Sequence, residues 1–546
     1  MGSKIRGKKR KITAEKLSAR FNSAKAIVAQ ILMLLVFVVQ PLMIGAESYR
    51  NITATKYYTY VVIISFAAVL FVTVSAVQAE QAIQSKKWKP RLNPESLRGV
   101  LRAVRPYEWA LLAYWFIMLI SASLSDNPYA AFVMSASSRR SESFFFVTGY
   151  LFSVFLIGRF YRPKQRGLLI MCATAALISL YGICQYYGND FLMLNVIRMR
   201  EAPGPGLIFI STMSNRNMLS TYLCIAFCVC AVMFSQLRPA GKKFIHSVPS
   251  LIYLVFGFII FYMMILGQTE SGYVGVLVAL AAVFPFAAKD SRSAARLLMM
   301  LAGCAYLLWV SIRIHAAFPL WQPTPWAAFE VWLIPLAAVL AVLALVLLFM
   351  PLPRLKAKTF RIAWYSAIAA VMIAIVIAIP MIAQVSGHKT IHAANEILQG
   401  NLDDSLGSHR MFIWRRAITL VPQRPIIGYG PDNFVIVFNE HFREEGLEKT
   451  NQAYDKAHSE YIQQLVDNGI LGLAALLAFY GISFWGLRKK LDNPMAAALL
   501  LGMTAFLVQA FFNFSTPFAH PVVWVLWGII NAVGTQKDIG KTGGLL

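Results

Sequence analysis

The chain has 546 residues, of which 58% are hydrophobic and only 14% charged, and its formal net charge is +26. This composition excludes an ordinary water-soluble domain, since most of such a surface must face lipid or other helices. The basic residues stand in short clusters between apolar runs rather than on one soluble domain, which argues against a nucleic-acid partner. The expected partner is therefore a lipid bilayer.

Apolar runs long enough to cross a bilayer recur along the chain. They lie near 24–45, 58–78, 108–124, 143–159, 167–185, 217–237, 250–266, 272–288, 297–312, 328–350, 362–385, 464–486, 494–512 and 521–534. The sequence predicts an all-α polytopic membrane protein with about 12–14 transmembrane helices. Residues 24–385 would hold eleven of them and residues 464–534 the last three.

The charge pattern predicts the orientation of these helices. Most of the 51 lysines and arginines fall in every second connection, beginning with the basic segment 1–23. Because cytoplasmic loops of membrane proteins carry this excess, we expect residues 1–23 and 535–546 to be cytoplasmic tails. The protein is then predicted to lie in the cytoplasmic membrane.

Two extracytoplasmic loops differ from the short connections. The loop from about 186 to 216 contains Pro203, Gly204, Pro205 and Gly206, which favours an irregular, re-entrant connection. The loop 386–463 is the only segment composed like soluble protein, and we expect it to be the catalytic loop.

The cysteines and the known motifs suggest no cofactor. Each of the six cysteines lies inside an apolar run, so neither a disulfide framework nor a zinc site is indicated. No glycine-rich phosphate loop or internal repeat is present in the sequence. We predict no cofactor and no metal.

One helix of the large loop places an arginine on its packing face. Ser408 is predicted to cap a helix from His409 to about Val421, with Arg410 and Trp414 on the same face. A guanidinium there suits an anionic group such as phosphate. The alternative is a structural salt bridge to a carboxylate of the loop.

A histidine lies near the end of the same loop. The spacing of Tyr454, His458, Tyr461 and Leu465 predicts one face of a helix that continues into the next transmembrane segment. Imidazole titrates near neutrality, so His458 is a candidate general base, or else a hydrogen-bonded buried side chain without chemistry. Two rival bases in the same loop, His409 and His441, are weaker candidates.

Two further features are candidates for anion binding. Gly428 and Gly430 form a tight turn within 425–434, and their backbone amides could face an anion or serve the turn alone. Arg216 directly precedes a transmembrane helix, where it would bind a substrate or only reach lipid phosphate.

Three stretches together resemble the O-antigen ligase and O-antigen polymerase superfamily of membrane glycosyltransferases. The strongest is Ala457-His458-Ser459-Glu460-Tyr461, continuing through Leu465, Gly469 and Gly472. The second comprises Arg410, Trp414, Ala417, Pro425, Gly428, Gly430 and Phe434, and the weakest is 214–220.

The resemblance implies a helical fold of the GT-C type and a reaction that is metal-independent and inverting. It implies His458 as the catalytic residue and Arg410 and Arg216 as pyrophosphate-binding residues, supported by Trp414, Tyr461, Gly428 and Gly430. The implied donor is a polyprenyl-pyrophosphate-linked glycan, and the acceptor is a glycan, lipid or protein. The choice between polymerase and ligase stays open.

The chain departs from the family pattern at two positions. Ser459 follows the histidine where many relatives have Asn, and Glu270-Ser271-Gly272 stands where many have Ser-Arg. If that arginine contacts donor phosphate, another residue must replace it. The alternative function is a polysaccharide or lipid-linked glycan transporter or flippase, which the hydropathy alone would also fit.

Overall fold

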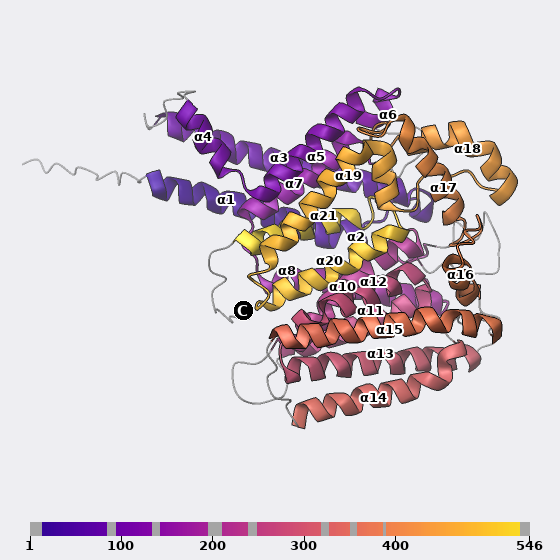
Figure 1. Cartoon of the computed structure of the whole chain (residues 1–546). Helices are drawn as coiled ribbons and strands as arrows, with labels where there is room; N and C mark the ends of the chain where they lie inside the picture. The colour runs from indigo at the N-terminus through magenta and orange to yellow at the C-terminus, as the bar shows by residue number, and fades with distance from the viewer. Residues whose placement is uncertain are drawn as a thin grey trace, which may run out of the picture.

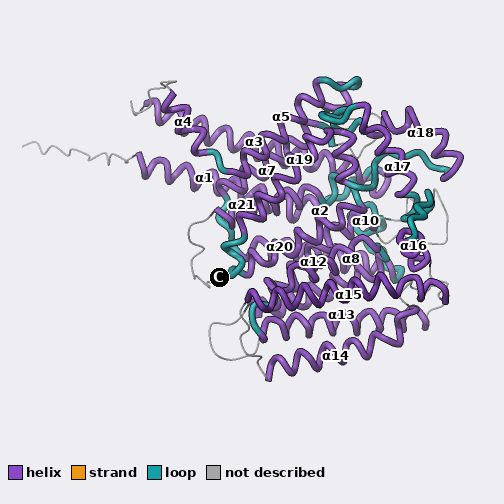
Figure 2. Tube along the Cα trace, in the orientation of Figure 1, coloured by secondary structure: helices purple, strands orange, loops and turns teal. Residues whose placement is uncertain are grey.

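The fold is described from a computed structural model. It describes residues 14–84, 94–133, 142–194, 210–237, 248–317, 327–349, 357–385 and 389–535. Within these ranges every regular element is a helix (Figures 1 and 2). Residues Pro203, Gly204, Pro205 and Gly206 of the predicted re-entrant loop lie outside the described residues.

The helices follow one another along the chain in two groups. The first group is α1 (Ala14–Leu34), η1 (Leu35–Val39), α2 (Gln40–Leu42), η2 (Ser48–Arg50), α3 (Ile52–Gln84), α4 (Pro94–Ala103), α5 (Pro106–Ser123), α6 (Pro128–Phe132), α7 (Phe144–Phe160), α8 (Gln165–Tyr186), α10 (Arg216–Gln236), α11 (Val248–Gly267) and α12 (Glu270–Ala287). The second is α13 (Ser291–Ala317), η3 (Ala327–Phe329), α14 (Glu330–Phe349), α15 (Ala357–Val385), α16 (Lys389–Leu398), α17 (Arg410–Leu420), η4 (Val421–Gln423), α18 (Phe434–Thr450), α19 (Glu460–Leu487), α20 (Pro494–Gln509), η5 (Ala510–Phe512) and α21 (His520–Thr535).

The polytopic all-α prediction is confirmed. Each predicted apolar run coincides with a helix, and in the described part of the chain eleven helices are long and apolar enough to cross a membrane. The three remaining runs form α5, α7 and α21, of which α7 and α21 are shorter apolar helices. The eleven spans fall just below the predicted 12–14 because these three helices are short or less apolar.

The helix bundle is built around α10. Every residue of α10 from Met218 to Gln236 is buried. The C-terminal helix α20 packs against α10 and α12, and α21 packs against α7 and α19. By contrast α14 and α15 are mostly exposed at one edge of the bundle (Figure 1), where α14 packs against α13 and α15 against α12. Their apolar surfaces therefore face lipid.

The large loop folds into a small helical lobe at one end of the bundle. It comprises α16, α17 and α18, and it lies at the end opposite to where α1 begins and α21 ends (Figure 1). The lobe has a hydrophobic core of its own, which includes Phe412, Phe434 and Phe438. This core extends to Val466 of α19, so the lobe is fixed to a transmembrane helix.

Candidate active site

His458 precedes helix α19 rather than lying on it. Residues 451–459 are not helical, and α19 begins at Glu460. The predicted helix through Tyr454 and His458 is therefore wrong at its start. His458 itself has a left-handed backbone, with a φ of 51°. Its half-buried ring packs nearly perpendicular to the ring of Phe514, with centroids 4.9 Å apart.

Arg410 begins α17 and faces the segment that follows α20. Its Nε donates to the carbonyl of Phe512 at 3.1 Å, and one terminal nitrogen donates to the carbonyl of Gly407 at 2.8 Å. The predicted cap by Ser408 is wrong, because His409 is the N-cap residue and makes no side-chain cap. The guanidinium has five N–H donors, and these two bonds fix its orientation while using only two.

Trp414 lies one turn after Arg410 and contacts the same segment. Its ring packs against Phe511 and Phe512, and its indole Nε1 donates to the carbonyl of Ala457 at 3.0 Å. Ala457 is the residue before His458. The predicted shared face of Arg410 and Trp414 is confirmed, and it links α17 directly to the histidine segment.

Tyr461 also contacts the segment after α20. Its hydroxyl donates to the carbonyl of Leu507 at 2.6 Å, and its ring lies 5.6 Å from that of Phe511. Arg410, Trp414, His458 and Tyr461 thus meet around residues 507–514. We call residues 510–515 the aromatic connection, since three of them are phenylalanine.

Arg216 is the first residue of α10 and is exposed. The side chain of Asn215 caps this helix by accepting from the N–H of Asn217 at 2.7 Å. The cap explains why the helix starts here, with the exposed arginine as its first residue. The carbonyl of Asn217, the next residue, accepts a hydrogen bond from Asn513, so this helix start borders the aromatic connection.

The starts of α10, α12 and α17 converge near the aromatic connection. Gln509 accepts from Thr221 of α10 at 3.1 Å and donates to Ser271 of α12 at 3.4 Å. Asn513 donates to the carbonyl of Asn217 at 3.2 Å. Because helix N-termini carry partial positive charge, this convergence favours an anion at the same place as the two arginines.

Glu270 is the one acid at these helix starts, since it begins α12. Burial lowers the pKa of Arg410, and the carboxylate of Glu270 opposes that shift. Gly272 follows Ser271, at the position where the family resemblance predicts an arginine. A Cβ at Gly272 would lie 2.0 Å from the hydroxyl oxygen of Ser220, so a side chain here requires Ser220 to move.

The glycine turn packs against α19. Gly428 and Gly430 have φ values of 69° and 108°, and a Cβ on Gly428 would lie 2.5 Å from the backbone of Asp467. The N–H of Gly428 donates to Arg424 and that of Gly430 to Asp467, at 3.1 and 2.8 Å. These amides therefore serve the turn.

The opposite side of the turn is a break in α19. Gly469 has a φ of 64°, and a Cβ there would lie 2.4 Å from the carbonyl of Ile426. The N–H groups of Ile470 and Leu471 donate to Pro425 and Ile426 instead of to their own helix. Close backbone contact at Gly428 and Gly469 thus joins the lobe to the membrane helix.

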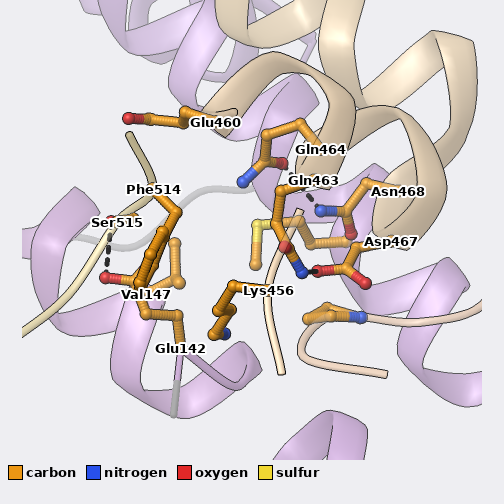
Figure 3. Close-up of a pocket in the computed structure, with 12 residues that line it drawn as sticks. Glu142, Val147, Lys456, Glu460, Gln463, Gln464, Asp467, Asn468, Phe514 and Ser515 are labelled. Carbon is orange, nitrogen blue, oxygen red and sulfur yellow. Dashed lines mark hydrogen bonds between the residues drawn. The ribbon is translucent and has the colours of Figure 1, made fainter. Parts of the chain in front are cut away.

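A small polar cavity lies near His458. It is lined by Glu142, Lys456, Glu460, Gln463, Asp467 and Phe514, among others (Figure 3). Its volume of about 20 Å³ has room for water but not for a sugar. Phe514 lines the cavity and also contacts His458, so its ring lies between the two.

The charges of this cavity are paired within the protein. Lys456 forms an ion pair of 2.6 Å with Asp432, and both side chains are almost completely buried. Burial opposes the charged form of Lys456, but the carboxylates of Asp432, Asp467 and Glu142 outweigh it and raise its pKa. Glu460 contacts His520 at 3.1 Å. The lysine is therefore held as a cation.

Two further histidines of the lobe, His409 and His441, have local surroundings. His409 is the N-cap residue of α17 without a side-chain cap bond, and His441 lies on α18 with its Nδ1 2.9 Å from the carbonyl of Val437. By contrast, the ring of His458 packs on the aromatic connection. Within the described residues, no cluster of three or more His, Cys, Asp or Glu side chains could hold a metal.

The aromatic connection and the polar start of α19 were not predicted from the sequence. Residues Phe511 to Ser515 form a short link between two apolar helices, and such links are usually only turns. Gln463 and Asp467 stand at the edge of an apolar run, where burial of polar groups is costly and marks a structural or functional role. That cost is the signal that could have identified them.

Comparison with known proteins supports the resemblance. Residues 333–477 match the family model described as O-antigen ligase, and this region includes Arg410 and His458. The match supports the O-antigen ligase and polymerase superfamily, a ligase- or glycosyltransferase-like enzyme, and a role in surface polysaccharide biosynthesis. The family implies lipid-linked glycan substrates and a bilayer environment.

One relative of unknown function is also similar. An uncharacterized protein of Haemophilus influenzae is 27% identical over 79 residues, which are 14% of this chain and 20% of the relative. The similarity therefore spans only a fifth of that protein's length.

Proposed function

Because its residues 333–477 match the O-antigen ligase family, we propose that this protein transfers or polymerises glycan from a polyprenyl-pyrophosphate-linked donor. The acceptor is a hydroxyl of a glycan, lipid or protein, and the reaction takes place at the outer face of the cytoplasmic membrane. His458 is the general base. Arg410 and Arg216 bind the donor pyrophosphate.

The observation that carries this proposal is the meeting of Arg410 and His458 on one short segment. Arg410 donates to Phe512, and His458 packs on Phe514, two residues later. A cation for the leaving group and a base for the acceptor are thus anchored on the same aromatic connection. In a group-transfer site, the cation and the base must be close enough to contact the donor and the acceptor at the same time.

In the proposed reaction, His458 takes the proton of the acceptor hydroxyl. The oxygen of this hydroxyl bonds to the anomeric carbon of the donor. The bond from that carbon to the pyrophosphate oxygen breaks, and the electron pair leaves with the pyrophosphate. Arg410 and Arg216 stabilise the charge that develops there, helped by the three helix N-termini. Attack from the side opposite the leaving group inverts the anomeric centre, and the scheme contains no metal step.

Replacement of His458 by Ala in the native host tests the proposal, with His441→Ala as the matched control from the same lobe. Surface polysaccharide and extracted lipid-linked glycan are compared with those of a deletion strain at equal membrane abundance. We expect His458→Ala to match the deletion and His441→Ala to match the wild type. Single repeat units on the lipid carrier would identify a polymerase, and long chains on the carrier a ligase.

The same strains separate this function from transport. A transporter defect would strand lipid-linked glycan at the cytoplasmic face, where externally added glycosidase does not reach it in intact spheroplasts. A transferase defect leaves the glycan accessible at the outer face. If the glycan of the deletion strain is protected from added glycosidase, the protein is a flippase and the transferase proposal is wrong.

A further inference from the structure

The backbone of His458 is held in an unfavourable conformation. A φ of 51° places a residue with a side chain in the left-handed region, which is energetically unfavourable. Such a conformation persists only where surrounding bonds fix it. The peptide groups that precede His458 supply these bonds.

Both polar groups of Ala457 are bound by side chains. Its carbonyl accepts from the indole of Trp414 at 3.0 Å, and its N–H donates to Oε1 of Gln463 at 2.8 Å. Ala457 is fully buried, so neither bond competes with water. The two peptide groups that flank Ala457 are therefore each fixed by one side chain.

The amide of Gln463 can adopt only one orientation. Its Nε2 donates to Oδ2 of Asp467 at 2.8 Å (Figure 3), so its oxygen must face Ala457. Asp467 in turn accepts from the N–H of Phe434 at 2.9 Å. A continuous chain of bonds thus runs from the glycine turn through Asp467 and Gln463 to the histidine segment.

The residue before Ala457 is Lys456, and its side chain fixes the backbone at this position. It pairs with Asp432 at 2.6 Å, and the two side chains are 4% and 0% exposed. The pair joins the histidine segment to the turn that precedes α18. Breaking it would leave a buried charge without a partner, which costs several kcal/mol.

Trp414 adds a link to the phosphate side of the site. It lies one turn after Arg410 on α17, and Arg410 donates to the aromatic connection. The helix that carries the proposed phosphate ligand therefore also holds the peptide before the proposed base. Through this helix the spacing between Arg410 and His458 is fixed.

We propose that Trp414 and Gln463 are positioning residues, which hold His458 at a fixed place relative to Arg410. This inference rests on the proposed function. Neither residue takes part in the proton or glycosyl transfer. Loss of either bond lets the left-handed peptide relax, and a shift of about 1 Å at a reacting group can lower the rate about a hundredfold.

Trp414→Phe and Gln463→Met test the inference, because the first keeps an aromatic ring, the second keeps the side-chain length, and both remove the hydrogen bonds. Tyr429→Phe is the control, since it removes hydroxyl bonds to Leu420 and Gln423 in the same lobe. Membranes carrying each variant are assayed with lipid-linked glycan extracted from the deletion strain. We expect kcat to fall at least tenfold, with the donor KM within twofold and thermal stability equal to that of Tyr429→Phe.

A double mutant distinguishes positioning from an independent role. If Trp414 acts through His458, Trp414→Phe causes no further loss in a His458→Ala background. A further loss there, an unchanged kcat in both folded single variants, or a raised donor KM at constant kcat would each overturn the inference. An active His458→Ala enzyme would instead refute the proposed base itself, so the two failures are distinguishable.

Discussion

The indole of Trp414 donates a hydrogen bond to the carbonyl of Ala457, which joins two segments 43 residues apart at the residue before His458. Arg410 lies on the same helix face as Trp414. A change in the position of α17 should therefore affect both the proposed phosphate ligand Arg410 and the proposed base His458.

Arg410→Ala should lower the transfer rate about a hundredfold or more, because a preorganised cation at the leaving group is lost. Arg410→Lys should recover part of the rate, since a lysine supplies charge but no planar fork. The assay is initial rate with extracted lipid-linked glycan. Arg415→Ala is the control, because Arg415 is an exposed neighbour on the same helix, and equal losses in both variants would contradict the assignment.

Arg216→Ala should raise the donor KM more than it lowers kcat if Arg216 holds the distal phosphate at the mouth of the bundle. Its charge acts through solvent, so the effect should shrink as salt is added. Arg313→Ala provides a comparison, since Arg313 is an exposed arginine paired with Glu330 on other helices. A KM that does not change at low salt would remove Arg216 from the site.

Gly469→Ala should destabilise the protein by about 3 kcal/mol or more, because the added Cβ meets the backbone of Ile426 at 2.4 Å with a φ of 64°. Gly481→Ala in the same helix meets nothing within 4 Å and should be neutral or stabilising by up to about 1 kcal/mol. Membrane abundance and thermal unfolding in detergent measure both. Similar stabilities for the two variants would refute the close contact.

The lobe should lose stability in acid through Glu445. Hydrogen bonds from Arg416 and Lys449 lower the pKa of Glu445 to about 2. Because this pKa is depressed, its contribution is present above the unfolded value near 4.3 and is lost as pH falls toward 2. The pair is partly exposed, so the loss should be about 1 kcal/mol or less.

Arg416→Ala provides the measurement for that prediction. Thermal unfolding at pH 7 and pH 3 should show a smaller pH dependence in Arg416→Ala than in the wild type. Arg415→Ala should retain the wild-type dependence, because Arg415 contacts Asp404 rather than Glu445. An unchanged dependence in Arg416→Ala would show that another group titrates.

The transmembrane helices could be predicted because each depends on local composition. An apolar run of sufficient length forms a helix whatever its neighbours are. The start of α19 could not be predicted in this way. The N–H and carbonyl of Ala457 bind Gln463 and Trp414 instead of helix partners, so the helical spacing around His458 does not produce a helix.

The site residues divide along the same line. Arg410, Trp414 and His458 were found because their residue types and spacing suggest chemistry. The aromatic connection was missed because Phe512 and Phe514 act through contacts more than 50 residues away along the chain from His458, or about a hundred from Arg410. No local pattern predicts such a pairing.

The packing of the last two helices has a consequence for biosynthesis. α20 packs against α10 and α12, α21 packs against α7 and α19, and the link between them contacts both Arg410 and His458. A nascent chain that has not reached residue 510 therefore lacks the residues that Arg410 and His458 contact. The proposed activity should therefore require residues 510–515, and chains that stop before them should not consume lipid carrier.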